Sequence, residues 1–202
     1  RCGCDIEISA QGGTLVSAKL KDYPVSKDTP DVPVQILNSA AESSYVIASG
    51  VIDAQHRQPD RLGPTHIATL SAPATKYTLT GDSLEVPLSW SSPDGLRVEK
   101  IYRFYRGRYN IDIEYRIHNQ SVSDWRALSY VQIRRHHNPP ERSMFNVDTY
   151  SYDGGIYYDG EKYEKVDPEE LEETPLKLAL TGGWIAFIQH HFLAAAVPPP
   201  DD

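Results

Sequence analysis

The sequence predicts an all-β domain, and three observations lead to this prediction. The 202 residues are 40% hydrophobic and include thirteen tyrosines, fifteen prolines and thirteen glycines, a composition typical of many short strands joined by tight turns. Several segments alternate apolar and polar residues with the period of a strand. Only one segment carries the sequence signals of a helix start. A chain of this length supports one hydrophobic core, so we expect a single domain over residues 1–202 made of two antiparallel sheets.

The first 20 residues predict a hairpin of two strands. Residues 4–10 alternate and end at Gln11-Gly12-Gly13, where glycine accepts a positive φ without penalty. Residues 14–20 return, and Pro24 is expected to close this strand. Residues 25–33 are expected to form a loop. The next strand candidates, in order, are residues 34–37, 45–52, 65–70 and 76–80.

The middle of the chain carries the clearest alternation. Residues 83–90 predict a strand, which Pro87 places at a sheet edge because proline has no N–H for the ladder. After a turn at residues 92–95, two alternating runs flank Arg106-Gly107. A two-residue turn there would set Phe104 opposite Tyr109, which brings apolar partners together.

The last third predicts further strands and one helix. Residues 125–135 alternate, and residues 150–165 suggest a hairpin or irregular lid around Gly154-Gly155 and Asp159-Gly160. Asp167 can cap a short helix near residues 168–174, with Pro168 at its first position. The acidic residues there read as the solvated face of that helix rather than a calcium loop.

Residues 181–197 form the stretch around which we expect the fold to be organised. Both alternating faces are apolar, which predicts one central strand covered on both sides. A membrane span is excluded, because the run is shorter than the roughly 20 residues a bilayer requires. Gln189, His190 and His191 also interrupt it.

Charge and cysteine content restrict the function. A formal net charge of −8 disfavours nucleic acid and anionic lipid as partners. Cys2 and Cys4 are too few for a metal site, so we interpret them as terminal thiols, with a local disulfide or an interchain crosslink as alternatives. No leader of basic and then apolar residues is present, so any signal or anchor is expected outside this sequence.

Motifs for catalysis or metal binding are weak. The adjacent pairs His136-His137 and His190-His191 point to opposite faces of a strand, so neither pair chelates by itself. Nucleophile-elbow, phosphate-loop and zinc-protease signatures are absent from the sequence. We expect no catalytic, metal or cofactor residues. Two alternatives stay open: carboxylates meeting across strands for sugar chemistry (Glu85, Glu99, Asp112 and Glu114), and an aromatic platform for sugar or peptide (Trp90, Trp125, Trp184 and the tyrosines).

Four ordered segments resemble one family. Gly182-Gly183-Trp184 with the apolar run to Phe192 is similar to a signature of the large periplasmic domain of the bacterial membrane protein insertase YidC. Gln11-Gly12-Gly13 through Tyr23-Pro24, Arg106-Gly107-Arg108-Tyr109 through Asn119, and Gly155-Ile156-Tyr157 with Glu161 to Lys165 match further stretches of that family. The matches cover residues 6–198.

The resemblance implies a β-supersandwich of the galactose mutarotase type, held on the periplasmic face of the bacterial inner membrane. It also implies a non-enzymatic role within an insertase and chaperone of membrane proteins, with nascent membrane proteins and Sec translocon components as partners. The family pattern continues past residues 198–202 with further strands and a linker helix, so we expect a truncated sandwich. The alternative function, suggested by this fold alone, is a carbohydrate-binding or aldose-epimerase-like protein.

Overall fold

The computed structural model describes residues 3–54, 63–136, 152–166, 182–189 and 191–199. The chain divides into two compact units, which are described separately. The first unit is Arg1–Asn38 with Val46–Arg134, and the second is Ser39–Tyr45 with Arg135–Asp202. The regular secondary structure of the described residues consists of strands and one turn of 3-10 helix, η1 (Ala41–Ser43).

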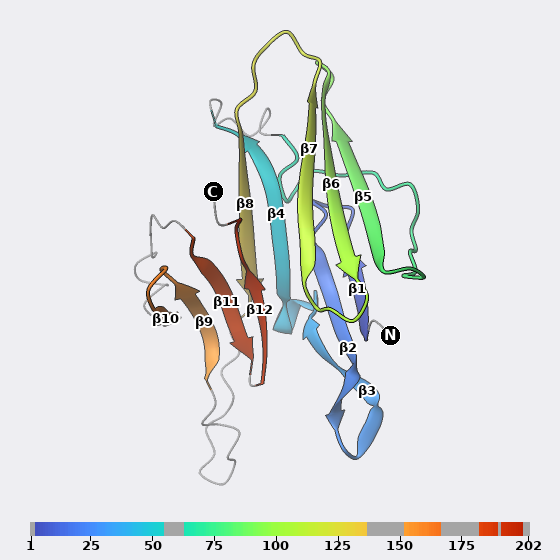
Figure 1. The fold of residues 1–202 in the computed structure, drawn as a ribbon, viewed down its shortest axis with the longest axis vertical. Coiled ribbons are helices and arrows are strands. Elements are labelled where there is room, and N and C mark those ends of the chain that lie inside the picture. The colour runs from blue at the N-terminus through green and yellow to red at the C-terminus, as the bar shows by residue number, and fades with distance from the viewer. Residues whose placement is uncertain (1–2, 55–62, 137–151, 167–181, 190, 200–202) are drawn as a thin grey trace. The chain divides into compact units, whose positions relative to one another are not determined.

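Strands β1 to β8 supply the first unit, except that Tyr45 and Arg135 belong to the second. Their bounds are β1 (Cys4–Ile8), β2 (Leu15–Ser26), β3 (Thr29–Leu37), β4 (Tyr45–Asp53), β5 (Ser83–Ser91), β6 (Leu96–Tyr105), β7 (Ile111–Asn119) and β8 (Ala127–Arg135). One sheet has the order β1-β2-β4-β8, with β3 also paired to β2. The other has the order β5-β6-β7, and Figure 1 shows these three strands side by side.

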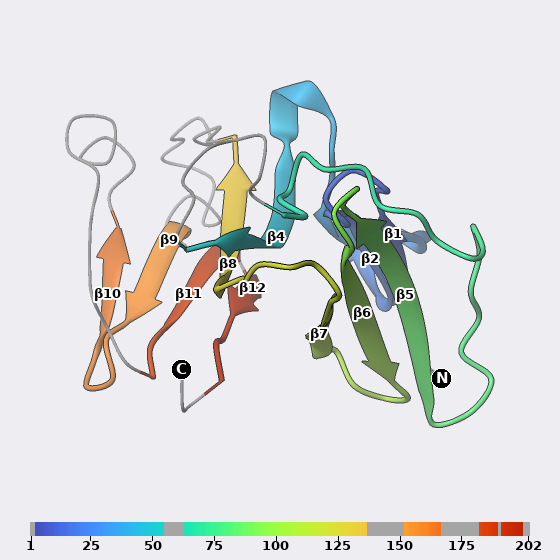
Figure 2. The same cartoon turned by 90° about the horizontal axis from the view of Figure 1, so that it is seen from above.

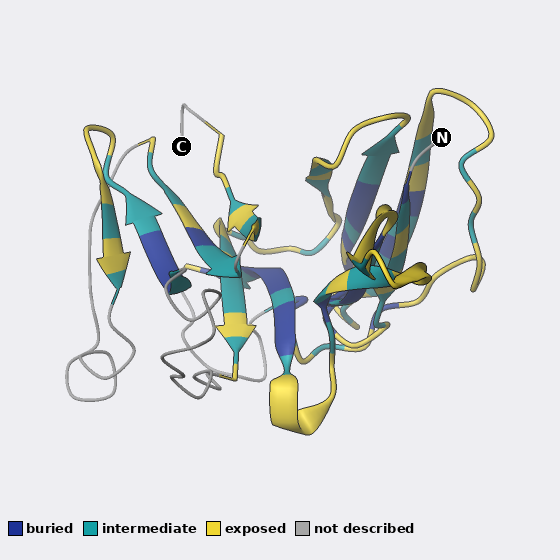
Figure 3. Ribbon diagram, turned by 90° about the horizontal axis from the view of Figure 1, so that it is seen from below, coloured by how far each residue is buried: buried dark blue, intermediate teal, exposed yellow. Residues whose placement is uncertain are grey.

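The two sheets of the first unit pack face to face. Alternate side chains of β6 face the other sheet, and among them Val98, Lys100 and Tyr102 are each at most 1% exposed. Their hydrogen bonds cross to the turn after β1 and to β4. Figure 3 shows buried residues along the strands and exposed residues in the turns. The expected all-β antiparallel sandwich is therefore confirmed.

The described residues of the second unit include an antiparallel sheet of order β10-β9-β11-β12, visible from above in Figure 2. Its strands are β9 (Asp153–Tyr158), β10 (Tyr163–Val166), β11 (Trp184–Gln189) and β12 (Phe192–Ala196). The hairpin expected within residues 150–165 is present as β9 and β10, and its turn contains Asp159 and Gly160. Gly154 and Gly155 lie inside β9 rather than in a turn. The helix predicted near residues 168–174 lies outside the described residues.

The prediction of one central strand over residues 181–197 was wrong. The stretch forms two strands, β11 and β12, which pair antiparallel with Gln189 opposite Phe192. β11 is internal to the sheet, but β12 pairs with no other described strand. Leu193 is 55% exposed and Val197 is 70% exposed, so the expected double cover does not extend to β12. The polar residues after Ile188 allow the chain to reverse where a continuous buried strand would have to bury them.

Two further predictions need correction. Pro24 does not close the second strand, and residues 25–33 are not a loop: β2 runs to Ser26 and pairs with β3, with register shifts on either side of Pro24. These irregularities accommodate a residue that has no N–H to donate. Residues 65–70 and 76–80 form no strand, although Thr69 makes an isolated bridge to Gln11.

The β6–β7 register also differs from the prediction. Phe104 lies opposite Ile111, not Tyr109, because the chain turns through a longer loop than Arg106-Gly107 alone. The shift is two residues, so the same side chains stay on the same face. Pro87 lies in β5, which is an edge strand of its sheet as predicted.

Candidate functional site

The paired glycines Gly12 and Gly13 form the turn between β1 and β2. Both have positive φ, 66° and 58°, a region that side chains with a Cβ rarely adopt. Gly12 also lies directly against the backbone of residues 66–68: its N–H donates to the Ala68 carbonyl at 2.7 Å. A Cβ at Gly12 would lie 2.2 Å from the His66 carbonyl oxygen. The turn therefore requires glycine for both conformation and space.

The carbonyl groups of this turn receive hydrogen bonds from β6. Lys100 Nζ donates to Gly12 O at 2.8 Å and to Gly13 O at 3.1 Å, and also to Ser49 O on β4 at 3.0 Å. The Tyr102 hydroxyl donates to Gly13 O as well. Lys100 was not identified as a buried residue from the sequence. The alternation gave a signal, because Lys100 lies on the same strand face as the apolar residues Leu96, Val98, Tyr102 and Phe104.

The other glycines of the family signature have a simpler role. Gly107 and Gly182 have φ of 69° and 72°, and a Cβ at either would meet no atom within 4 Å. Tyr109 follows Gly107, is 52% exposed and lies 6.2 Å, ring to ring, from Tyr23. Glycine at these two positions serves the backbone conformation alone.

In the second unit, Gly183 precedes β11 and Trp184 begins it. The Trp184 ring stacks on Tyr158 of β9, with ring centroids 5.7 Å apart and an interplanar angle of 17°. Phe192 begins β12 and is half-buried. Trp184 is thus packed across strands of the second unit. In the first unit, Trp90 lies on β5 and Trp125 precedes β8, each partly buried.

A partly buried ion pair also lies in the second unit. The Arg135 guanidinium donates to Asp153 at 2.9 Å and to the Ile188 carbonyl at 3.3 Å. It lies 5.3 Å from the ring centroid of Tyr45 and 5.5 Å from that of Phe187. The arginine side chain is only 10% exposed, so this cluster holds the ends of β8 and β4 against the sheet of that unit.

The four carboxylates considered for sugar chemistry lie on the outer face of the β5-β6-β7 sheet and are already paired. Arg103 bridges Glu85 at 2.7 Å and Glu114 at 3.1 Å. Arg116 donates to Glu114 at 2.6 Å and holds the pKa of that carboxyl below its ordinary value. Asp112 accepts from the Tyr105 hydroxyl at 2.6 Å, and Glu99 from Arg97. A general acid requires a raised pKa, the opposite of what Arg116 produces.

The histidine and cysteine candidates form no site among the described residues. His137, His190 and Cys2 lie outside those residues, while His136 and His191 are exposed and Cys4 begins β1. No group of three or more His, Cys, Asp or Glu that could hold a metal occurs there. That part of the chain likewise contains no helix with the length and apolarity to cross a membrane.

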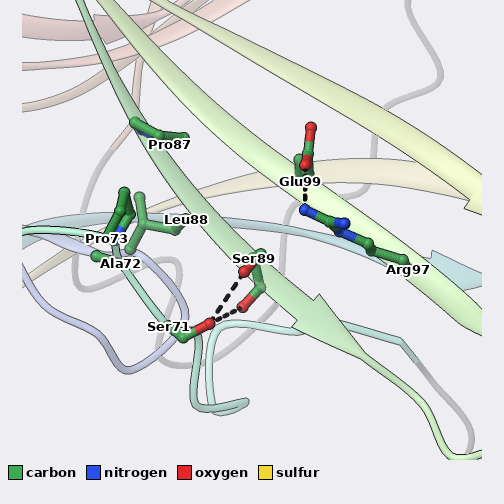
Figure 4. A pocket seen from close by; sticks show the side chains of 8 residues that line it. All are labelled: Ser71, Ala72, Pro73, Pro87, Leu88, Ser89, Arg97 and Glu99. Carbon is green, nitrogen blue, oxygen red and sulfur yellow. Dashed lines mark hydrogen bonds and ion pairs between the residues drawn. The ribbon is translucent and has the colours of Figure 1, made fainter.

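A cavity of about 330 Å³ opens beside β5. Figure 4 shows its lining: Ser71, Ala72, Pro73, Pro87, Leu88, Ser89, Arg97 and Glu99. Its polar groups bond to one another, Ser71 Oγ to Ser89 Oγ at 2.9 Å and Arg97 to Glu99 at 2.6 Å. The backbones of Ser71 and Ser89 also exchange two hydrogen bonds of 2.8 Å, which close this part of the β5 edge.

Comparison with known proteins identifies relatives of the whole chain. The family model of the YidC periplasmic domain matches residues 4–202. The protein "Membrane protein insertase YidC" of Thioalkalivibrio sulfidiphilus is 40% identical over 200 residues, which cover 96% of this chain and 35% of the relative. Its counterpart in Methylococcus capsulatus is 39% identical over 202 residues, 98% of this chain and 35% of the relative. The chain spans about a third of the length of these curated relatives. With a family match across nearly every residue, the chain belongs to the YidC periplasmic domain family.

Proposed function

We propose that this chain is the periplasmic interaction module of an inner-membrane protein insertase. It acts without catalysis or cofactor, and it assists the insertion and folding of membrane proteins, with or without the Sec translocon. The relatives named as membrane protein insertases support this assignment. The observation that carries the interaction role is the exposed apolar edge strand β12.

β12 has the properties of a docking edge. Its sequence, Phe-Leu-Ala-Ala-Ala, carries no charge and no proline, the two usual devices that protect an edge. Among the described strands it pairs only with β11. Leu193 within β12 and Val197 directly after it are more than half exposed. An extended segment of another protein can add to such an edge through main-chain hydrogen bonds, with apolar side chains filling alternate positions.

The edge β5 provides a contrast within the same chain. Pro87 removes one ladder donor there, and the bridge between Ser71 and Ser89 covers another part of the edge. β12 has neither feature. We therefore propose that partners dock at β12. The partner that fits this edge is an extended, largely apolar polypeptide, such as a segment of a nascent membrane protein or a loop of a translocon subunit.

Photo-crosslinking tests the proposal. A benzophenone amino acid replaces Leu193 or Val197 in the full-length insertase, in membranes that contain the Sec translocon and a stalled nascent membrane protein. Val122, which is fully exposed in the β7–β8 connection, is the matched control. Adducts with the nascent chain or a Sec subunit from Leu193 and Val197, but not from Val122, support the proposal. Equal adducts from all three positions, or none from β12, refute docking at this edge.

The sugar-related alternative is tested separately. It predicts that the chain accelerates mutarotation of a common aldose and that His136→Ala abolishes the effect. The arginine pairing of Glu85 and Glu114 favours the interaction role, because neither carboxyl is arranged as a general acid. Acceleration that is lost in the His136 variant would overturn our assignment.

A further inference from the structure

Lys100 is a buried cation held by carbonyl groups. It is 1% exposed, and its Nζ lies within 2.8 to 3.1 Å of three backbone oxygens, those of Gly12, Gly13 and Ser49. None of the ion pairs among the described residues involves Lys100. A charge placed so deeply normally has a carboxylate partner, because desolvation is costly. Here the compensation comes from backbone oxygens and aromatic rings.

The protonation state of Lys100 determines how many of the three carbonyls its side chain can bond. An ammonium group has three N–H donors, which match the three carbonyl acceptors. A neutral amine has two, so deprotonation removes the Lys100 hydrogen bond from one of the three carbonyls, of which only Gly13 O has a second donor, the Tyr102 hydroxyl. Two of these carbonyls belong to the Gly12-Gly13 turn and one to β4, so the loss falls on the contact between the two sheets of the first unit.

The groups that face Lys100 do not titrate with it. On β6 and β7 these are the phenols of Tyr102 and Tyr115, whose ring centroids lie 5.2 and 5.9 Å from Nζ. Burial raises the pKa of Tyr115 to about 12 and that of Tyr102 further, so both stay neutral below pH 10. The turn offers only carbonyls, and β4 offers Ser49, with its one acidic residue, Asp53, four positions along.

We infer that Lys100 is a proton-dependent clamp between the two sheets of the first unit: the ammonium form ties the Gly12-Gly13 turn and β4 to β6, and loss of the proton releases one of these ties. Burial lowers the pKa of this ammonium from its ordinary value of 10.5 to about 7. The release therefore falls near neutral pH. This device is independent of partner docking at β12.

Nuclear magnetic resonance of the 202-residue chain tests the clamp directly. Lysine is labelled with ¹³C at Cε, and the Lys100 signal is identified by its loss in Lys100→Met. We expect that signal to titrate near pH 7, and the amide signals of Gly12, Gly13 and Thr14 to move with the Lys100 midpoint. A Lys100 midpoint above about 9.5, near the ordinary lysine value, overturns the inference. So does a turn whose amides do not follow the lysine.

Stability provides a second readout. Because the folded pKa is lowered, the unfolded chain takes up this proton first as pH falls from 10.5 to 7, which favours unfolding. The folding equilibrium constant of the native chain relative to Lys100→Met should rise about fiftyfold from pH 7 to pH 9, since one proton is linked and relief of the buried charge outweighs the hydrogen bond that is lost. Lys76→Met, which removes an exposed lysine, should show no such change. Should Lys100→Met fail to fold, Lys100→Arg supplies the reference for the same pH comparison, because a guanidinium stays protonated throughout this range.

Discussion

Substituting Gly12 by alanine should be far more destabilising than the same change at Gly107, although both residues have nearly the same φ, 66° and 69°. An L-residue with a Cβ costs about 1–2 kcal/mol in this left-handed region. Gly107→Ala meets no atom within 4 Å, so it should cost about that amount and no more.

Gly12→Ala adds a collision. The new Cβ would lie 2.2 Å from the carbonyl oxygen and 2.4 Å from the Cα of His66, and backbone atoms cannot turn aside as the end of a flexible side chain can. The turn and residues 66–68 would have to separate, which breaks the bond from Gly12 N to Ala68 O. Each buried hydrogen bond lost in this way costs about 1–3 kcal/mol. With the conformational cost, the total is about 3–5 kcal/mol.

Urea unfolding of the purified chain, followed by tryptophan fluorescence, measures both variants. Asparagine separates the two causes, because it tolerates the left-handed region better than alanine. Gly107→Asn should recover much of the loss, and Gly12→Asn should not. Equal destabilisation by the two alanine variants, or rescue of Gly12 by asparagine, would show that the contact with His66 is not what requires glycine there.

Three further predictions follow from buried groups. Arg135→Met should destabilise the chain by about 2–3 kcal/mol, because Asp153 stays partly buried without its partner, and adding Asp153→Asn should restore part of the loss in the same urea assay. Tyr102→Phe should cost about 1 kcal/mol, since the carbonyl it bonds keeps a second donor; a loss above 3 kcal/mol would contradict this. Burial raises the pKa of Tyr45 and Tyr115 to about 12, so the unfolded chain, with tyrosine pKa near 10, loses these protons first and stability should fall between pH 10 and 12. Tyrosinate absorbance near 295 nm, which should rise in two separate phases, checks this last expectation.

The sequence was most informative where local chemistry decides the structure. The alternation from Ser83 to Asn119 predicted β5, β6 and β7, and Pro87 predicted the edge position of β5. The glycine pair at Gly12 and Gly13 predicted a turn, because few other residues adopt positive φ twice in succession. These features depend on residues close in the chain, so a local pattern suffices to find them.

Predictions failed where a distant contact decides. The run after Gly182 is apolar throughout, and apolarity does not distinguish one long strand from the β11–β12 hairpin. Pro24 suggested an end to β2, yet irregular pairing with β3 carries the strand past it. The β6–β7 register was displaced by two residues because the loop length is set by more than the Arg106-Gly107 pair.

By itself, the sequence determined the antiparallel all-β class, the turns that need glycine, and membership of the YidC periplasmic domain family. Only the tertiary structure decided why Gly12 admits no side chain and where the charge of Lys100 is compensated, since His66 and Ser49 are far away in the sequence. The physical reason is that strand alternation specifies which face a side chain occupies. The atoms that meet it there come from another sheet or a remote segment, and only the folded chain brings them together.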